Sequence, residues 1–206
     1  APKQKACVEA LLNGELLLTQ AKKQFGSAAV KALIEKALAH VVEQVPVFEE
    51  ARWVSTFNIA EKPVPDTEQS VAIAALNRQH SQFVVSLLEG VTGSGKTEVY
   101  LQAIEPLLEQ GKQILILVPE IGLTPQTVAR FERRFNIDVG VLHSQLSDKA
   151  RLQVWQRAQA GELGIVIGTR SAIFTPLKNP GMLIVDEEHD ESFKQQDGLR
   201  YHARDL

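Results

Sequence analysis

The sequence has a single cysteine, little net charge and no long apolar run, and each shortage excludes a class of protein. Cys7 is the only cysteine in 206 residues, so neither a disulfide nor a cysteine-based zinc cluster can form within this chain. No apolar run approaches the ~20 residues of a membrane-spanning helix, and no signal-peptide pattern is visible. The formal net charge of −3 offers no bulk attraction for nucleic acid. We therefore expect a cytoplasmic protein without a membrane partner, whose chemistry lies in local motifs.

The content of apolar residues, by contrast, is ordinary for a globular protein. Hydrophobic residues make up 44% of the chain and charged residues 23%, which predicts a sizeable core. A length of 206 residues allows one large domain or two small ones. The residue patterns favour a division into 1–55, 56–66 and 67–206.

Residues 1–55 predict a small, mainly helical domain. Apolar spacing indicates three helices, over 3–13, 19–25 and 28–39. Ser27 suits the N-cap of the third helix, and 41–47 is β-branched and extended. Three short helices followed by a strand outline a winged helix-turn-helix, whose third helix usually enters the major groove of DNA. The surface of that helix is not strongly basic, so a docking or spacer module is the alternative.

Residues 56–66 are typical of a linker. Pro63 and Pro65 forbid a helix there and favour an extended path. Asp66 or Thr67 can then cap a helix over 68–79.

Segment 67–206 alternates between predicted strands and predicted helices. Strands are expected over 83–88, 113–118, 139–142, 164–167 and 182–185. Helices are expected over 96–110, 124–135 and 147–160, with a kink or an early end at Pro106. Because each strand is almost continuously apolar, the pattern indicates an α/β fold with a parallel sheet covered by helices on both faces.

Residues 90–97 carry the most specific motif of the chain, Gly-Val-Thr-Gly-Ser-Gly-Lys-Thr, which matches the phosphate-loop pattern G-x-x-x-x-G-K-[ST]. Glycines let the backbone turn so that successive N–H groups, and the start of the following helix, face phosphate oxygens. The predicted nucleotide-binding residues are Gly90, Thr92, Gly93, Ser94, Gly95, Lys96 and Thr97. Lys96 would reach the β- and γ-phosphates, and the Thr97 hydroxyl would join a Mg²⁺ shell. A Gly/Ser turn that happens to carry Lys-Thr is the alternative.

The predicted strand over 182–185 ends in acidic residues. Ligands collect at the carboxyl ends of parallel strands, so these acids can face the phosphate loop. Asp186 suits the Mg²⁺ shell, and Glu187 suits orienting and deprotonating the attacking water. Such acids commonly cap the next helix, but together with the phosphate loop they predict a hydrolytic site with Lys96, Asp186 and Glu187 as its catalytic residues.

At this point a resemblance to a known family becomes specific. Asp-Glu-Glu-His at 186–189 resembles the DEAH/DExH form of the Walker B element in superfamily 2 helicases. The blocks that resemble the bacterial primosomal replication-restart helicases are 90–100, 118–127, 168–174, 186–190, 194–196 and 200–205. The resemblance implies a RecA-like P-loop lobe over 67–206 and, with weaker signatures, the family's winged-helix domain over 1–55.

The resemblance also implies roles for individual residues. By position it assigns DNA contacts to Thr124, Pro125, Gln126, Thr169 and Arg170. The free N–H groups of a helix start suit a phosphate, and an arginine after a buried strand can grip the DNA backbone, although it can also form a surface ion pair. Gln69 lies where related helicases place an adenine-binding glutamine, with a solvated helix residue as the alternative. His189 would couple the hydrolysis site to the DNA motifs, or else cap a helix.

For the whole protein, the resemblance implies ATP- and Mg²⁺-dependent 3′-to-5′ translocation on DNA, at forks where replication restarts. The implied partners are forked or single-stranded DNA, primosome proteins and single-stranded DNA-binding protein, and the implied state is a monomer.

The family's Ser-Ala-Thr motif, second lobe with its arginine finger, zinc-binding cysteines and DNA 3′-end-binding domain are not in this sequence. We therefore expect a piece of a longer protein, with zinc only in the rest of it, that binds nucleotide but hydrolyses it poorly. There are two alternatives: a winged-helix regulator with a nucleotide-switch domain, and a small-molecule kinase.

Overall fold

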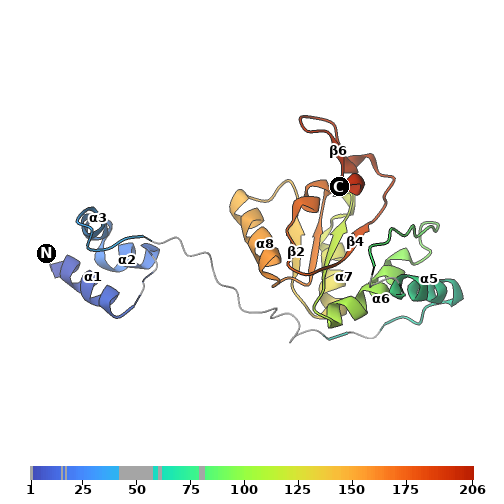
Figure 1. The fold of residues 1–206 in the computed structure, drawn as a ribbon, viewed down its shortest axis with the longest axis horizontal. Coiled ribbons are helices and arrows are strands. Elements are labelled where there is room, and N and C mark those ends of the chain that lie inside the picture. The colour runs from blue at the N-terminus through green and yellow to red at the C-terminus, as the bar shows by residue number, and fades with distance from the viewer. Residues whose placement is uncertain (1, 15, 17, 42–57, 60–61, 79–81) are drawn as a thin grey trace. The chain divides into compact units, whose positions relative to one another are not determined.

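The computed structural model describes residues 2–14, 16, 18–41, 58–59, 62–78 and 82–206 (Figure 1). The chain divides into two compact units, Ala1–Val47 and Phe48–Leu206. Most of the strand expected over 41–47 and much of the linker expected over 56–66 lie outside the described residues. The winged-helix assignment and its domain boundaries therefore stay predictions.

The described part of the first unit contains the three helices that the apolar spacing predicts. They are α1 (Pro2–Leu12), α2 (Leu18–Phe25) and α3 (Ser27–Glu35). Their common core consists of Cys7, Ala21, Phe25, Val30 and Leu33. The expected end of the third helix at 39 is wrong, because α3 ends at Glu35 and Ala37 adopts a left-handed φ of 52°. The expected Ser27 cap is also wrong, since Gly26 occupies the N-cap and no side chain caps the helix.

The second unit contains the predicted parallel sheet. Its strands are β1 (Gln113–Leu117), β2 (Val139–Leu142), β3 (Ile165–Gly168) and β4 (Pro180–Val185), in the order β2-β3-β1-β4. Leu117 pairs with Gly168 on one side and with Val185 on the other. The carboxyl ends of these three strands are therefore level, and the residues that follow them lie along one edge of the sheet.

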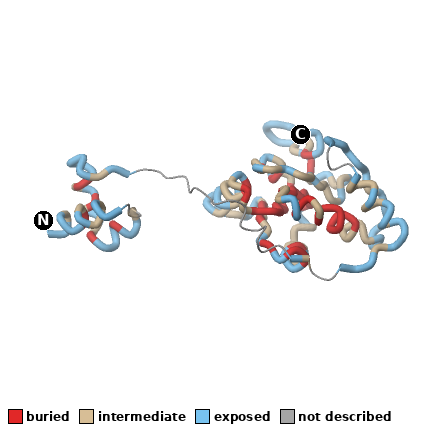
Figure 2. The backbone as a smooth tube through the Cα atoms, turned by 60° about the horizontal axis from the view of Figure 1, so that its bottom comes forward, coloured by how far each residue is buried: buried red, intermediate tan, exposed pale blue. Residues whose placement is uncertain are grey.

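Helices cover both faces of this sheet, as the sequence predicts. On one face, α6 (Lys96–Glu109) and α7 (Pro125–Phe135) form a core with alternate residues of β1, β3 and β4. On the other face lie α8 (Asp148–Ala160) and the short 3₁₀ segments η2 (Arg170–Phe174), η3 (Glu191–Phe193) and η4 (Ala203–Asp205). In Figure 2 the buried stretches gather in the interior of this unit.

Helices α5 (Thr67–Asn77) and α6 lie on either side of the phosphate loop in the sequence. Helix α5 begins at the predicted cap Asp66 and packs beside α6 (Figure 1). Helix α6 continues through Pro106 to Glu109. Of the two alternatives expected at the proline, a kink or an early end, the early end is therefore wrong. The segment η1 (Glu120–Gly122) and the two-stranded pair β5 (Lys194–Gln195) and β6 (Tyr201–His202) are elements that the sequence did not predict.

The strand expected over 83–88 is wrong. Residues 83–91 form no helix or strand, and Phe83, Val85 and Leu87 expose more than four fifths of their surface. An apolar run becomes a strand only when a neighbouring strand accepts its backbone hydrogen bonds. Within the described chain, no strand lies on the outer side of β4 or beside this run.

No helix among the described residues is both long and apolar enough to cross a membrane.

Candidate functional site

The phosphate-loop sequence forms a tight turn that leads directly into α6. Gly93 and Gly95 have φ angles of 85° and 81°, in the left-handed region where L side chains are strained. Gly95 is the N-cap of α6, so the unpaired N–H groups of the first helical turn follow it directly. A Cβ at Gly90 would lie 2.7 Å from the Oγ atom of Ser94, so the loop folds back closely on its first residue. The loop thus has the backbone geometry of an anion cradle.

Lys96 places its ammonium group inside this loop. Its Nζ atom donates to the carbonyl of Gly90 across 2.7 Å and to that of Val91 across 3.3 Å. A charged donor held only by carbonyl groups can exchange them for phosphate oxygens, which form stronger, charge-assisted hydrogen bonds. The position of Lys96 therefore suits its predicted role.

Gln69 links α5 to the phosphate loop. Its backbone N–H donates to Asp66 across 2.8 Å, and its Oε1 accepts from the Asp66 N–H across 3.1 Å, which completes a capping box. Its Nε2 donates to the Ser94 carbonyl across 3.0 Å. Both ends of the side-chain amide are engaged, so the structure brings Gln69 to the loop as a backbone support. Its predicted adenine contact stays a prediction.

The acidic pair lies at the carboxyl end of β4, as predicted. The Asp186 N–H donates to the Leu117 carbonyl across 2.9 Å, so the parallel sheet fixes the residue's position. Glu187 adopts a left-handed φ of 52°, which costs a non-glycine residue about 1 kcal/mol or more. Its N–H donates to Oδ1 of Asp186 across 3.1 Å.

Tyr100 approaches the same carboxylate from α6. Its hydroxyl donates to Oδ2 of Asp186 across 3.2 Å, while its ring stacks on Phe131 with centroids 6.3 Å apart. Burial, and then the negative charge of Asp186, raise the pKa of the Tyr100 hydroxyl well above its usual range. The hydroxyl therefore keeps its proton at neutral pH and can donate it to the hydrogen bond with Asp186.

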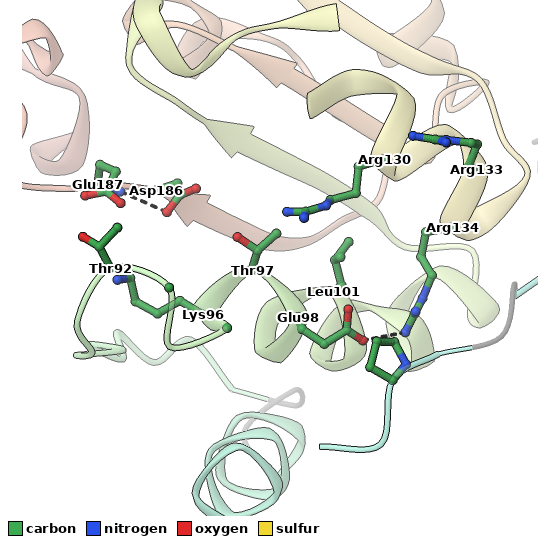
Figure 3. A pocket seen from close by; sticks show the side chains of 13 residues that line it. Thr92, Lys96, Thr97, Glu98, Leu101, Arg130, Arg133, Arg134, Asp186 and Glu187 are labelled. Carbon is green, nitrogen blue, oxygen red and sulfur yellow. Dashed lines mark hydrogen bonds and ion pairs between the residues drawn. The ribbon is translucent and has the colours of Figure 1, made fainter. Parts of the chain in front are cut away.

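Figure 3 shows that the phosphate loop, Lys96 and the acidic pair share one cavity, whose volume is about 700 Å³. Phosphate-loop residues lie along one side, and Asp186 and Glu187 close the end at β4. Three arginines of α7, Arg130, Arg133 and Arg134, line the opposite wall. The guanidinium of Arg130 extends toward Thr97 and Asp186 (Figure 3).

The α7 arginines were not predicted as site residues. A signal was present, since positions 130, 133 and 134 have the i, i+3, i+4 spacing of one helical face. That spacing alone does not tell a solvated basic face from the wall of a cavity.

Arg134 lies at the centre of a buried network of charges. One of its terminal nitrogens donates to Glu98 and to Glu105 of α6, at 2.9 Å in each case. Lys62 donates to the other oxygen of Glu105 across 2.7 Å, and Gln102 donates to Glu98 across 2.8 Å. The side chains of Arg134 and Glu105 are 7% and 6% exposed. The network joins the phosphate-loop helix to α7 and to residues 62–63.

The predicted DNA contacts Thr124, Pro125 and Gln126 lie at the start of α7. Thr124 is its N-cap and accepts from the Thr127 N–H across 3.2 Å, and Pro125 occupies the first turn, where a missing N–H costs nothing. The sequence argument for a helix start there is confirmed.

Thr169 and Arg170 follow β3, where the register places them beside the end of β1. Arg170 donates from one terminal nitrogen to the carbonyls of Ser192 and Lys194, across 3.1 and 2.8 Å. It thereby ties η2 to the segment that follows the acidic turn. Thr169 is buried, and its N–H donates to the Leu142 carbonyl. Their DNA contacts stay predictions.

A second cavity, of about 450 Å³, connects the acidic pair with the start of α7. It shares Thr97, Arg130, Asp186 and Glu187 with the first cavity and reaches Thr127 and Gly122 near the helix start. His189 lines it, with Nε2 3.7 Å from Oε2 of Glu187. The structure thus places His189 close to Glu187, in a cavity that also reaches the first turn of α7. Its coupling role stays a prediction.

The residues present fit a nucleotide with Mg²⁺. Among the described residues no group of three His, Cys, Asp or Glu side chains could hold a metal by itself. Mg²⁺ does not require one, because it commonly binds through one or two carboxylates, substrate phosphates and water. Thr97 and Asp186 lie together in both cavities, beside a loop shaped for phosphate.

Comparison with known proteins identifies the family. The family model described as DEAD/DEAH box helicase matches residues 66–206. The chain belongs to this family. The match to a DEAD/DEAH box helicase begins at the capping residue of α5 and includes the sheet, the phosphate loop and the acidic turn.

Three relatives of this chain share one name. "Replication restart protein PriA" of Haemophilus influenzae is 67% identical over 127 residues, which cover 62% of this chain. The proteins of that name from Bacillus subtilis and Chlamydia trachomatis are 43% and 40% identical, over 90% and 100% of this chain. The chain spans only 17%, 23% and 28% of the length of these three relatives.

Proposed function

We propose that this chain supplies the ATP- and Mg²⁺-binding lobe of a 3′-to-5′ DNA helicase that acts in replication restart. One observation carries the proposal: the phosphate loop, Thr97, Asp186 and Glu187 line a single cavity at the carboxyl edge of the sheet. The family match and the shared name of the relatives support the reaction class and the process.

The predicted site residues have distinct roles in ATP hydrolysis. Lys96 and the loop N–H groups bind the β- and γ-phosphates, and Thr97 and Asp186 hold Mg²⁺ through their oxygen atoms. Mg²⁺ neutralises the charge that develops on the phosphates. Glu187 orients the attacking water and accepts its proton. Gln69 supports the loop and contacts the adenine.

The DNA-binding part of the proposal rests on the ends of two elements. Thr124, Pro125 and Gln126 present the start of α7, whose free N–H groups suit a DNA phosphate. Thr169 and Arg170 lie at the end of β3, where the Arg170 contacts with Ser192 and Lys194 hold the loop in place. His189, in the second cavity, couples nucleotide hydrolysis to these DNA contacts.

The proposed partners follow from the proposed process. They are forked or single-stranded DNA, primosome proteins and single-stranded DNA-binding protein. We propose that a monomeric helicase binds them in the cytoplasm.

Phosphoryl transfer needs an aligned water and charge neutralisation around the γ-phosphate. A single lobe supplies only part of this, so we expect the isolated chain to bind ATP but hydrolyse it slowly.

Fluorescent-nucleotide titrations test the proposal. Lys96→Ala should weaken ATP affinity at least ~10-fold, because it removes a charge-assisted phosphate contact. Lys149→Ala, which removes an exposed lysine on the opposite face of the sheet, should leave the affinity unchanged. A wild-type chain that binds no ATP, or equal losses in both variants, would contradict the proposal. Rapid DNA-stimulated hydrolysis by the isolated chain would contradict the expected slow turnover.

A further inference from the structure

Tyr100 lies at an unusual junction between the hydrophobic core and the acidic pair. It comes one helical turn after Thr97 in α6, and it is 7% exposed. Its ring belongs to the core cluster formed by α6, α7 and the sheet, where it lies nearly parallel to the ring of Phe131, at 10°. Core packing therefore fixes the ring, and the ring in turn fixes where the hydroxyl points.

The hydroxyl completes a two-sided restraint on the Asp186 carboxylate. Oδ2 accepts from Tyr100 across 3.2 Å, and Oδ1 accepts from the Glu187 N–H across 3.1 Å. An ionised carboxylate has about four acceptor positions, so roughly two stay available once these donors are satisfied. With one donor on each oxygen, the carboxylate cannot rotate without losing a hydrogen bond. Its remaining acceptor positions therefore keep a constant direction.

The Thr97 side chain belongs to the same arrangement. Thr97 lines both cavities together with Asp186, and it is close enough to the Tyr100 hydroxyl to influence its pKa. The phenol that holds Asp186 thus lies beside both side chains that are proposed to hold the cation.

We propose that Tyr100 is a positioning residue for the divalent cation: its hydroxyl orients the Asp186 carboxylate so that it faces Mg²⁺ beside Thr97. The proposal rests on the nucleotide and Mg²⁺ site described under "Proposed function", and it assigns that site a residue outside the phosphate-loop and Asp-Glu motifs. Partners that orient metal ligands typically change metal affinity 10- to 100-fold when they are removed.

Tyr100→Phe tests this role, because it removes only the hydroxyl and keeps the ring in the core. We expect the Mg²⁺ concentration that half-saturates tight nucleotide binding to rise about 10-fold. Nucleotide affinity in EDTA should not change, since phosphate-loop contacts are untouched. Direct Mn²⁺ binding in the presence of nucleotide, measured by electron paramagnetic resonance, should weaken by the same factor.

Tyr201→Phe is the matched control, because Tyr201 is the second of the two tyrosines and lies in β6, where its ring makes an edge contact with Phe174. It should leave the Mg²⁺ dependence unchanged. Asp186→Asn, which removes a proposed ligand, should shift the dependence at least as far as Tyr100→Phe.

The outcomes separate this inference from the proposed function. If the wild-type chain binds nucleotide with a clear Mg²⁺ dependence and Tyr100→Phe shows the same dependence, Tyr100 is only a core residue and the inference fails alone. If EDTA affinity falls together with Mg²⁺ affinity in Tyr100→Phe, the hydroxyl supports the fold and the positioning role is also refuted. If the wild-type chain binds no nucleotide, both proposals fail.

Discussion

Replacing Arg134 with methionine should cost the second unit about 3 kcal/mol of unfolding free energy. The substitution keeps an apolar side chain of similar length in α7 but leaves the carboxylates of Glu98 and Glu105 without the cation that lies 2.9 Å from each. Removing one member of a buried ion pair typically costs 3–5 kcal/mol, because the remaining charge stays in a poorly hydrated place.

Contacts that remain put the expected loss at the low end of that range. Glu105 keeps Lys62 at 2.7 Å, although the lysine side chain is 48% exposed and its charge is partly screened. Glu98 keeps the Gln102 amide at 2.8 Å and is 21% exposed itself. The uncompensated charge is thus partly relieved at both carboxylates.

Urea unfolding followed by the fluorescence of Trp155 in α8 measures this loss. A Trp53→Phe background makes Trp155 the only tryptophan, because the sequence has two. Adding Glu98→Gln to Arg134→Met should recover at least ~1 kcal/mol, since the double variant no longer holds an unpaired charge at position 98.

Arg133→Met is the control. Arg133 lies on the same helix but is exposed, and its Nε donates only to the Ala129 carbonyl of its own helix. Its replacement should change stability by no more than ~0.5 kcal/mol. A loss below ~1 kcal/mol for Arg134→Met, or no recovery in the double variant, would refute the view that the network is a buried, mutually compensated set.

Two further substitutions test the backbone around the site. Gly168→Ala should lower the free energy of unfolding of the second unit by ~1–3 kcal/mol, because its Cβ would lie 2.6 Å from the Leu142 carbonyl oxygen and 2.4 Å from Cβ of Ala172. A free energy of unfolding in urea within ~0.5 kcal/mol of wild type would contradict this close approach of β2 and β3. Asp66→Ala should cost ~1 kcal/mol through loss of the capping box of α5, whereas Asp66→Asn should retain most of the stability, since asparagine also caps. Amide hydrogen exchange in α5 measures the difference, and equal protection in the two variants would show that the cap contributes nothing.

Local sequence rules predicted most of the second unit because its two central strands, β1 and β3, are buried along their whole length. Runs such as 113–118 and 164–167 are almost purely apolar and stand between amphipathic helices, a pattern that only a covered parallel sheet satisfies. The phosphate loop and the acidic pair were predictable for a related reason. Their chemistry fixes residue type and spacing within eight or fewer positions, so no long-range information is needed.

Long-range pairing explains what the sequence could not predict. Residues 83–88 have the composition of a strand, but strand formation depends on a neighbour, and composition does not name one. Arg134 meets Glu98 and Glu105 across 36 and 29 positions of sequence, and Tyr100 meets Asp186 across 86. Only the packing of α6 against α7 and the sheet shows that these polar groups face one another.

At Glu187 the residue that would best stabilise the fold differs from the residue that the proposed reaction needs, because the backbone there is left-handed. Glycine, and to a lesser degree asparagine, adopts a φ of 52° at little cost, so either would relieve roughly 1 kcal/mol of strain at the end of β4. Neither supplies the carboxylate that we propose accepts a proton from water. A search for thermostable variants based on folding energy alone would therefore select against the proposed general base, and residue 187 should be held fixed in any such engineering.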